Sequence, residues 1–166
     1  MATATELFMR CLENEGVDKI FGIPGEENLY VMDALRGSSI EFITVRHEQA
    51  AAFMADVHGR LTGKAGVCLT TLGPGATNLI TGFADANMDR SPVVAIAGQG
   101  ATTRMHKESH QILDLTRLFE PISKYSVEIL EPEIIPELVR KAFKDAQAEK
   151  RGGVRLSASR KILPAR

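Results

Sequence analysis

Helical and strand-like patterns alternate along this chain, and this alternation limits its fold more than any other feature. Short apolar runs that predict strands lie at residues 17–23, 40–45, 67–72, 92–97 and 125–130. Segments with a helical spacing of apolar residues lie at 3–16, 29–37, 47–62, 74–88, 113–119 and 132–149. Strands that are separated by helices assemble as parallel βαβ units with right-handed crossovers. The predicted fold class is α/β: a three-layer, doubly wound, mostly parallel six-stranded sheet with helices on both faces.

The bulk properties fit one globular domain. The chain has 166 residues, which is enough for one domain with its own hydrophobic core and too few for two. Hydrophobic residues make up 44% and charged residues 25%, as in ordinary globular proteins. The net charge of -1 gives no indication of binding to nucleic acid or to a membrane, and no apolar run approaches the ~20 residues of a membrane helix. Glu6, Arg10 and Glu13 interrupt the first apolar pattern, so it is not a signal peptide. The isolated Cys11 and Cys68 predict buried thiols in a reduced, cytoplasmic compartment, with a disulfide as the less favoured alternative.

A glycine–proline loop follows the third predicted strand. Its residues Gly73-Pro74-Gly75 open a helix, so the backbone can approach a ligand closely. A dinucleotide site would need a third glycine where Asn78 stands and an acid after the next strand, which instead ends in Gly98-Gln99. Pro74 also removes an amide that a phosphate would use. The loop therefore favours a plain strand-to-helix turn, or a site for something other than a nucleotide phosphate.

A single acid, Glu48, stands near the start of the helix predicted at residues 47–62. A lone carboxylate beyond a strand end suits proton exchange with a bound heterocycle better than hydrolysis, which usually needs a second acid, a nucleophile or a metal. The alternative is an acid that only stabilises the helix start, by about 0.3–1 kcal/mol. His106 and His110 have a spacing that would suit a metal on a helix, but no third ligand is evident, so no metal site is predicted.

Four ordered motifs favour the first interpretation of Glu48. They are Phe21-Gly22-Ile23-Pro24-Gly25, Arg46-His47-Glu48-Gln49-Ala50-Ala51-Ala52-Phe53-Met54-Ala55, Gly59-Arg60-Leu61-Thr62-Gly63 and Gly73-Pro74-Gly75-Ala76-Thr77-Asn78. In this order they resemble the N-terminal pyrimidine-binding domain of thiamine-diphosphate-dependent enzymes. Residues 110–125 are similar to the acetolactate synthase branch of that family. We therefore expect the pyrimidine-binding domain over residues 1–153.

The resemblance implies a role for each matching residue. In that family the glutamate that matches Glu48 bonds the ring nitrogen N1′ of the aminopyrimidine and promotes loss of the thiazolium C2 proton, which is catalysis through a cofactor. The resemblance places Pro24, Gly25 and Glu26 near the thiazolium and the substrate. It places Thr71, Pro74 and Asn78 beside the pyrimidine, and Gln111 on the substrate side. Cofactor binding is thus expected from Pro24, Gly25, Glu26, Glu48, Thr71, Pro74 and Asn78.

The same resemblance implies that partners are needed. Relatives continue with a middle domain and a diphosphate-binding domain, and the latter holds the phosphates and Mg²⁺ through a Gly-Asp-Gly motif. This chain has no Gly-Asp step. In the family, the pyrimidine domain of one subunit meets the diphosphate domain of another. We therefore expect a homodimer that presents half of a site for thiamine diphosphate and a 2-oxo acid such as pyruvate, inactive alone. The alternative is a non-catalytic, dimerising regulatory module with the same fold.

Residues 154–166 form an atypical tail by comparison with the family. Residues 160–165 can be encoded CGG AAG ATA TTG CCC GCC. If the Ser159 codon ends in C, the same DNA read from that C gives Pro-Glu-Asp-Ile-Ala-Arg, which resembles the family's continuation. Our hypothesis is that the reading frame shifts near Gly153; the alternative is a divergent tail or a deliberate end. Because the strand expected here lacks the usual alternation, we expect it to pair poorly with the sheet.

Overall fold

A computed structural model describes residues 3–105 and 107–159 of the chain. The six strands are β1 Lys19–Gly22, β2 Glu41–Thr44, β3 Gly66–Thr70, β4 Val93–Gln99, β5 Tyr125–Ile129 and β6 Gly153–Ser159. The α-helices are α1 Ala4–Asn14, α2 Leu29–Leu35, α3 Glu48–Thr62, α4 Pro74–Asn78, α5 Ile80–Met88, α6 Leu115–Phe119 and α7 Ile135–Gln147. Short 3₁₀ turns lie at η1 Glu26–Asn28, η2 Thr102–Arg104, η3 Glu120–Ile122 and η4 Pro132–Ile134.

The sheet has the order β2-β1-β3-β4-β6-β5, and every pair of neighbours is parallel. β1 and the edge strand β2 lie on one side of β3, while β4, β6 and β5 lie on the other, so the direction of winding reverses after β2. Each parallel step is closed by a helical crossover. The predicted α/β, doubly wound class is confirmed, and the sheet is entirely rather than mostly parallel.

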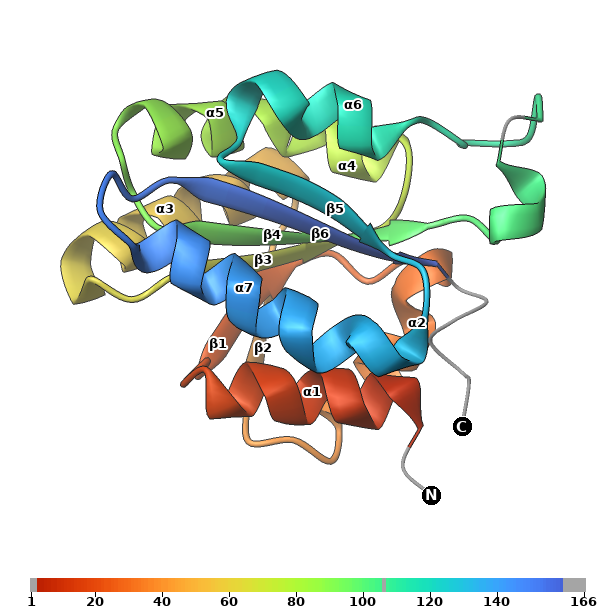
Figure 1. Cartoon of the computed structure of the whole chain (residues 1–166), viewed down its shortest axis with the longest axis horizontal. Coiled ribbons are helices and arrows are strands. Elements are labelled where there is room, and N and C mark those ends of the chain that lie inside the picture. Colours follow the sequence, from red (N-terminus) through yellow and green to blue (C-terminus); the bar gives the residue numbers. More distant parts are fainter. Residues whose placement is uncertain (1–2, 106, 160–166) are drawn as a thin grey trace.

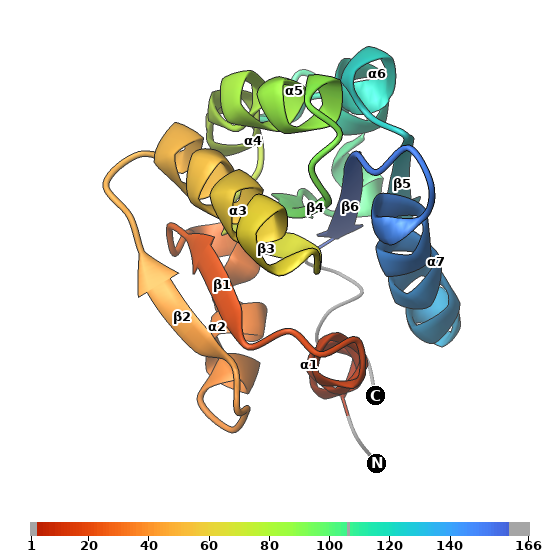
Figure 2. The ribbon, with the colours of Figure 1, turned by 90° about the vertical axis from the view of Figure 1, so that its left-hand side faces the viewer.

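Helices cover both faces of the sheet (Figures 1 and 2). In the end-on view of Figure 2, α3, α4, α5 and α6 lie on one side of the strands, and α1, α2 and α7 lie on the other. Each face has its own apolar cluster. Phe8 and Phe143 belong to the cluster under α1 and α7, while Phe83 and Phe119 belong to the cluster under α5 and α6. The arrangement is the predicted three-layer fold.

Successive side chains of the strand β3 enter different cores. Its burial is complete at every position. Val67 and Leu69 join the α1–α7 core, whereas Cys68 between them joins the α5–α6 core. A run that is apolar at every position therefore forms a strand covered on both faces, because successive side chains point to opposite faces. The predicted burial is confirmed for the Cys68 thiol, whereas Cys11 is only partly buried.

The helix boundaries follow local signals. The side chain of Thr3 accepts a hydrogen bond from the Glu6 backbone, and the Glu6 carboxylate accepts one from the Thr3 backbone, which completes a capping box at the start of α1. Gly63 ends α3 with φ at 73°, a conformation that glycine adopts without strain. The helix predicted at residues 132–149 begins as the 3₁₀ turn η4 and continues as α7.

The prediction that the last strand pairs poorly is wrong. β6 lies inside the sheet, paired with β4 over its whole length and with β5 over five residues. All of its residues are buried. The strand has an alternation after all, because Val154, Leu156 and Ala158 enter the α1–α7 core while the polar residues between them face the other side. The sheet thus continues past the domain boundary that we predicted at residue 153, and the tail at 160–166 lies outside the described residues.

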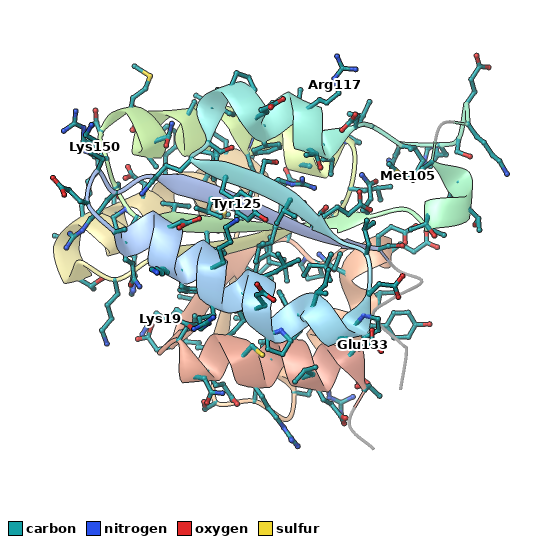
Figure 3. All side chains as sticks on the ribbon, viewed as in Figure 1. Lys19, Met105, Arg117, Tyr125, Glu133 and Lys150 are labelled. Carbon is teal, nitrogen blue, oxygen red and sulfur yellow. The ribbon has the colours of Figure 1, made fainter. Side chains whose placement is uncertain are left out.

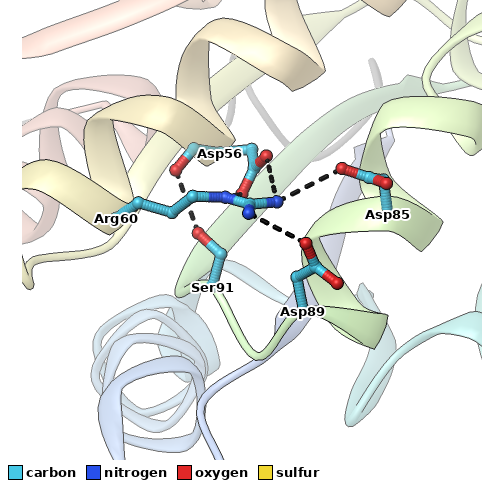
Figure 4. Close-up of polar contacts among 5 residues, drawn as sticks. All are labelled: Asp56, Arg60, Asp85, Asp89 and Ser91. Atoms are coloured by element: carbon cyan, nitrogen blue, oxygen red, sulfur yellow. Dashed lines mark hydrogen bonds and ion pairs between the residues drawn. The ribbon is translucent and has the colours of Figure 1, made fainter.

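A group of charged side chains joins α3 to α5 (Figure 4). Arg60 in the last turn of α3 donates to Asp56 at 2.8 Å and to Asp89 and Asp85 at 2.8 and 3.2 Å. Ser91 donates to the backbone oxygen of Asp56 at 2.9 Å. The Asp56 carboxylate beside it raises the pKa of the Arg60 guanidinium, which therefore stays charged. This network fixes the orientation of α3, the helix that carries Glu48.

Candidate functional site

The carboxylate of Glu48 lies at the first turn of α3 and is half-buried. The helix is capped by His47, whose Nδ1 accepts a hydrogen bond from the Gln49 backbone at 3.2 Å. Glu48 Oε2 accepts a hydrogen bond from Asn78 Nδ2 at 2.9 Å. Two residues that stand thirty positions apart in the sequence are therefore joined directly, and the carboxylate has a defined orientation.

The glycine–proline loop lies under the same carboxylate. Gly73 has φ at 54° and ψ at -119°, and Pro74 occupies the first position of α4, where its missing N–H costs nothing. A Cβ built on Gly75 would lie 2.6 Å from Thr70 Oγ1 and 3.4 Å from Glu48 Oε1. Gly75 is buried, and the absence of a side chain there lets the loop pack closely against Thr70 and beside Glu48 Oε1. The Glu48 carboxylate is therefore packed against the glycine–proline loop and hydrogen-bonded to Asn78.

The loop after β1 packs against the residue that follows β3. A Cβ on Gly25 would lie 2.6 Å from the Cβ of Thr71, so only glycine permits this approach. The Gly25 backbone donates to Asn28 Oδ1 at 2.8 Å, and Asn28 Nδ2 donates to the Ile23 oxygen at 3.2 Å. These bonds shape the loop that carries Pro24 and Glu26, both of which are exposed. Two of the predicted segments therefore meet at the carboxyl edge of the sheet, where open α/β folds bind ligands.

A cavity of about 350 Å³ opens beside these loops. It is lined by Glu26, Glu27, Thr71, Leu72, Arg104, His110 and Gln111. The backbone of Gln111 has φ at 60°, and a Cβ on Gly73 would lie 2.5 Å from the Gln111 oxygen. The segment after β4 is thus seated on the glycine–proline loop, and this contact brings Gln111 to the predicted site.

The predicted site residues fall into two adjacent groups. Glu48, Asn78 and Pro74 lie together at the glycine–proline loop and the start of α4. Glu26, Thr71 and Gln111 line the cavity. The backbone of residues 73–75 lies between the two groups, since Gly73 packs against Gln111 and Gly75 lies beside Glu48.

Sequence reasoning missed Glu27 and Arg104. Glu27 is 5% exposed, and its Oε1 lies 3.7 Å from Arg104 Nη1. A signal for Glu27 was available, since an acid directly after Pro-Gly-Glu belongs to the loop already implicated. No signal marked Arg104, because its neighbours in the sequence carry no periodic pattern.

Other reactive groups lie away from this site. Burial raises the pKa of the Cys68 thiol to about 12, so this side chain inside β3 stays protonated at neutral pH. Both cysteines are free. Among residues 3–105 and 107–159 no three potential metal ligands come together; His106, one of the spaced histidines, lies outside the described residues. None of the helices in that part of the chain is long and apolar enough to span a bilayer.

Comparisons with known proteins point to one family. The family model for the thiamine pyrophosphate enzyme, N-terminal TPP binding domain, matches residues 2–118. The chain is 48% identical over 158 residues to the acetolactate synthase of Bacillus subtilis (strain 168) and 44% identical over 162 residues to the catabolic acetolactate synthase of Raoultella terrigena. It is 45% identical over 157 residues to the probable acetolactate synthase large subunit of Methanocaldococcus jannaschii.

These matches cover 95%, 98% and 95% of this chain but only 28%, 29% and 27% of the three relatives. The chain thus spans little more than a quarter of their length. Glu48, the glycine–proline loop and the segments that precede Leu118 all lie inside the matched region. The chain belongs to the thiamine pyrophosphate enzyme family, as its N-terminal TPP binding domain.

Proposed function

We propose that this chain supplies the pyrimidine-binding half of the active site of an acetolactate synthase-like enzyme, which decarboxylates and joins 2-oxo acids such as pyruvate. The observation that carries the proposal is the half-buried Glu48 carboxylate, held by Asn78 at 2.9 Å beside the glycine–proline loop. A lone, half-buried acid with one oxygen held by a neutral amide is suited to exchanging a proton with a heterocycle.

In this proposal each residue has a defined task. Thiamine diphosphate, when bound, supplies the carbon nucleophile and the electron sink for the reaction. Glu48 Oε1 hydrogen-bonds the ring nitrogen of the pyrimidine, while Asn78 occupies Oε2 and keeps the carboxylate in place. Thr71 and Pro74 form the wall beside the ring. Pro24, Gly25 and Glu26 border the reacting end, and Gln111 contacts the 2-oxo acid.

We propose that residues outside this chain bind the diphosphate group of the cofactor. The sequence has no Gly-Asp step of the kind that the family uses for Mg²⁺ and diphosphate, and the chain spans 28% of the Bacillus subtilis relative. We propose that a diphosphate-binding domain of another subunit holds Mg²⁺ and the cofactor's phosphates. This chain alone then binds the cofactor weakly and does not turn over substrate.

An exposed apolar stripe supports the proposal of a partner subunit. On α3, Met54, Val57 and Leu61 are 39%, 50% and 82% exposed, and on α5 Met88 is 80% exposed. These spacings place the α3 residues on one face of the helix. Large exposed apolar groups on one face mark an interaction surface in many proteins. We propose that this stripe packs against a second subunit.

A substitution on the stripe tests whether this face binds a second subunit. Leu61→Glu is expected to weaken self-association of the chain at least tenfold, because it places a charge in an apolar contact, and sedimentation equilibrium measures the change. The control is Leu130→Glu, since Leu130 is 53% exposed but lies after β5, away from α3. An equal response of both variants, or none for Leu61→Glu, would contradict a dimer through this face.

The same stripe favours one alternative function, a dimerising module that regulates a full-length enzyme without contributing to catalysis. Calorimetry with thiamine diphosphate and Mg²⁺ separates the two proposals. If the chain is half of a site, adding a separately prepared diphosphate-binding domain should tighten cofactor binding at least tenfold. If the chain is a regulatory module, it should bind intact subunits while the cofactor affinity stays unchanged.

We also propose a cytoplasmic location. The support is that Cys11 and Cys68 are both free, as thiols are in a reducing compartment. Localisation of a tagged chain by cell fractionation tests this, and recovery in an exported fraction would contradict it.

A further inference from the structure

Arg155 is the largest fully buried side chain among the described residues, with an exposed fraction of 0%. It lies on β6 between Val154 and Leu156, which face α7, so it points to the opposite face, toward α6. On the neighbouring strand β5, Ser126 is paired with Arg155 and Glu128 is paired with Ser157. Figure 3 labels Tyr125, which faces the α7 side where Lys141 lies 3.9 Å from its ring centroid, so Ser126 and Glu128 share the α6 face with Arg155.

We call the following side chains the Arg155 cluster: Arg155 and Ser157 of β6, Ser126 and Glu128 of β5, and Thr116 of α6. One edge of the guanidinium is satisfied within it. Arg155 Nη1 donates to Thr116 Oγ1 at 3.1 Å and to Ser126 Oγ at 3.2 Å. Ser126 Oγ in turn donates to the Thr116 backbone oxygen at 3.2 Å. This edge holds α6 on the sheet.

The other edge of the guanidinium has no protein partner among the described residues. Nε and Nη2 of Arg155 are buried without a hydrogen bond, and the same holds for Oε1 of Glu128 and Oγ of Ser157. No ion pair within 4.0 Å joins Arg155 to Glu128 in the described part of the chain. Burial lowers the pKa of Arg155 to about 10 and raises the pKa of Glu128, while each charge partly offsets the shift of the other. The two groups are therefore close but not in contact.

The chemistry of the four unpaired atoms limits what can satisfy them. The guanidinium atoms only donate, and the Glu128 oxygen only accepts. A halide or phosphate would satisfy the donors but would be repelled by Glu128, and an ammonium ion would be repelled by Arg155. Water both accepts and donates, and buried waters ordinarily have two to four polar partners.

We propose that the Arg155 cluster is a buried hydration site, in which ordered water accepts hydrogen bonds from Arg155 Nε and Nη2 and donates to Glu128 Oε1 and Ser157 Oγ. The site lies under α6, apart from the glycine–proline loop. It therefore stands or falls independently of the proposed function.

Nuclear magnetic resonance of the unmodified chain tests the site directly. The Arg155 Nε proton, assigned from its loss in Arg155→Lys, should give cross-peaks to water whose signs report a long-lived bound molecule. The buried Gln99 side chain is the control, because its Nε2 donates to the Leu113 oxygen at 3.0 Å and should show no such cross-peak. Repeating the measurement in Ser126→Ala removes a hydroxyl that could relay exchange with water. A slowly exchanging Arg155 Nε proton with no water cross-peak would overturn the proposal.

Substitutions provide a second test, on thermal unfolding. Arg155→Leu and Glu128→Leu should each lower the melting temperature by roughly 5–15 °C, since each leaves one buried charge without its counterpart. The double variant should lose clearly less than the sum of the two, because a shared water links the pair. Additive losses would contradict the proposed bridge.

Discussion

The hydrogen bond from Asn78 to Glu48 determines how the candidate catalytic carboxylate is presented. It satisfies Oε2 with a neutral donor and leaves Oε1 beside Gly75. A carboxylate held in this way loses less conformational freedom when it binds a ring, because its rotamer is already selected. In the proposed site, Asn78 is thus a positioning residue for Glu48.

Replacing Asn78 by Asp tests this arrangement. The variant places a second carboxylate 2.9 Å from the first, so we expect a loss of about 1–2 kcal/mol of stability at neutral pH. Adding Glu48→Gln to the Asp variant should restore most of this loss, since an amide can donate to the new acid. Urea denaturation measures both. Equal stabilities for Asn78→Asp and the parent would show that the two side chains do not interact.

Cys68 gives the chain a predicted dependence on alkaline pH. Burial raises the pKa of its thiol from an ordinary value of 9.0 to about 12 in the folded chain. The folded state therefore keeps a proton that the unfolded state loses, and the stabilisation is fully present below pH 9 and lost as the pH rises toward 12. The loss amounts to roughly 3–4 kcal/mol at the upper end. Between pH 8 and 11, the free energy of unfolding should fall less steeply with pH in Cys68→Ala than in the parent chain. The same dependence on pH in both would contradict the prediction.

Individual residues were predictable from the sequence where a motif marked them. Glu48 and the glycine–proline loop stand in recognisable patterns, whereas the bond between Glu48 and Asn78 depends on how α3 and α4 pack. The ion pair of Glu27 with Arg104 joins a loop after β1 to a loop after β4, and no spacing rule relates two irregular segments. Arg155 was also missed, because hydropathy does not predict an arginine at a position buried on both faces.

At the scale of the elements, α3 has a different task at each end. Its first turn carries Glu48, and its last turn carries Arg60, which binds the carboxylates of Asp56 in α3, Asp85 in α5 and Asp89 just after α5 (Figure 4). Gly59 lets α3 approach the loop that precedes β4, since a Cβ there would lie 2.5 Å from the Pro92 oxygen. The charged network therefore fixes the helix far from the site and thereby the direction of the carboxylate at its start.

The Arg60 network can be tested by comparing two changes. Arg60→Leu leaves Asp56, whose side chain is 3% exposed, without its charged partner, and we expect a loss of about 2–3 kcal/mol after allowing for the partly exposed arginine. Asp89→Asn changes a side chain that is 54% exposed and should cost less than about 1 kcal/mol. Guanidinium denaturation ranks the two. The reverse order would contradict a buried Asp56–Arg60 pair.

Most elements were predictable because their signals are local. The Thr3 capping box, Gly63 after α3 and the apolar run of β4 each act within a few residues. The exception was β6, where we expected poor pairing. Pairing depends on the neighbours β4 and β5 on both sides, and these neighbours provide enough burial to accommodate alternate polar residues.

At the scale of the whole molecule, the loops after β1, β3 and β4 gather at the carboxyl edge of one parallel sheet (Figure 1). This edge brings together the Gly25 loop, the Gly73–Gly75 loop and the cavity at Gln111. The same molecule leaves an apolar stripe exposed along the middle and last turn of α3, the helix whose first turn carries Glu48. An open site edge next to an unpartnered helix face is the arrangement expected for one half of a site shared between subunits.

The most direct test of this account measures the proton at thiamine C2. In a chimera, this chain replaces the matching 158-residue segment of the Bacillus subtilis relative, so that the remaining domains are present. Deuterium exchange at C2 of bound thiamine diphosphate is then compared between the chimera and its Glu48→Gln variant. We predict that the variant binds the cofactor within about tenfold of the parent and exchanges the proton about 10²–10⁴ times more slowly. An unchanged exchange rate in a variant that still binds the cofactor would contradict the role of Glu48.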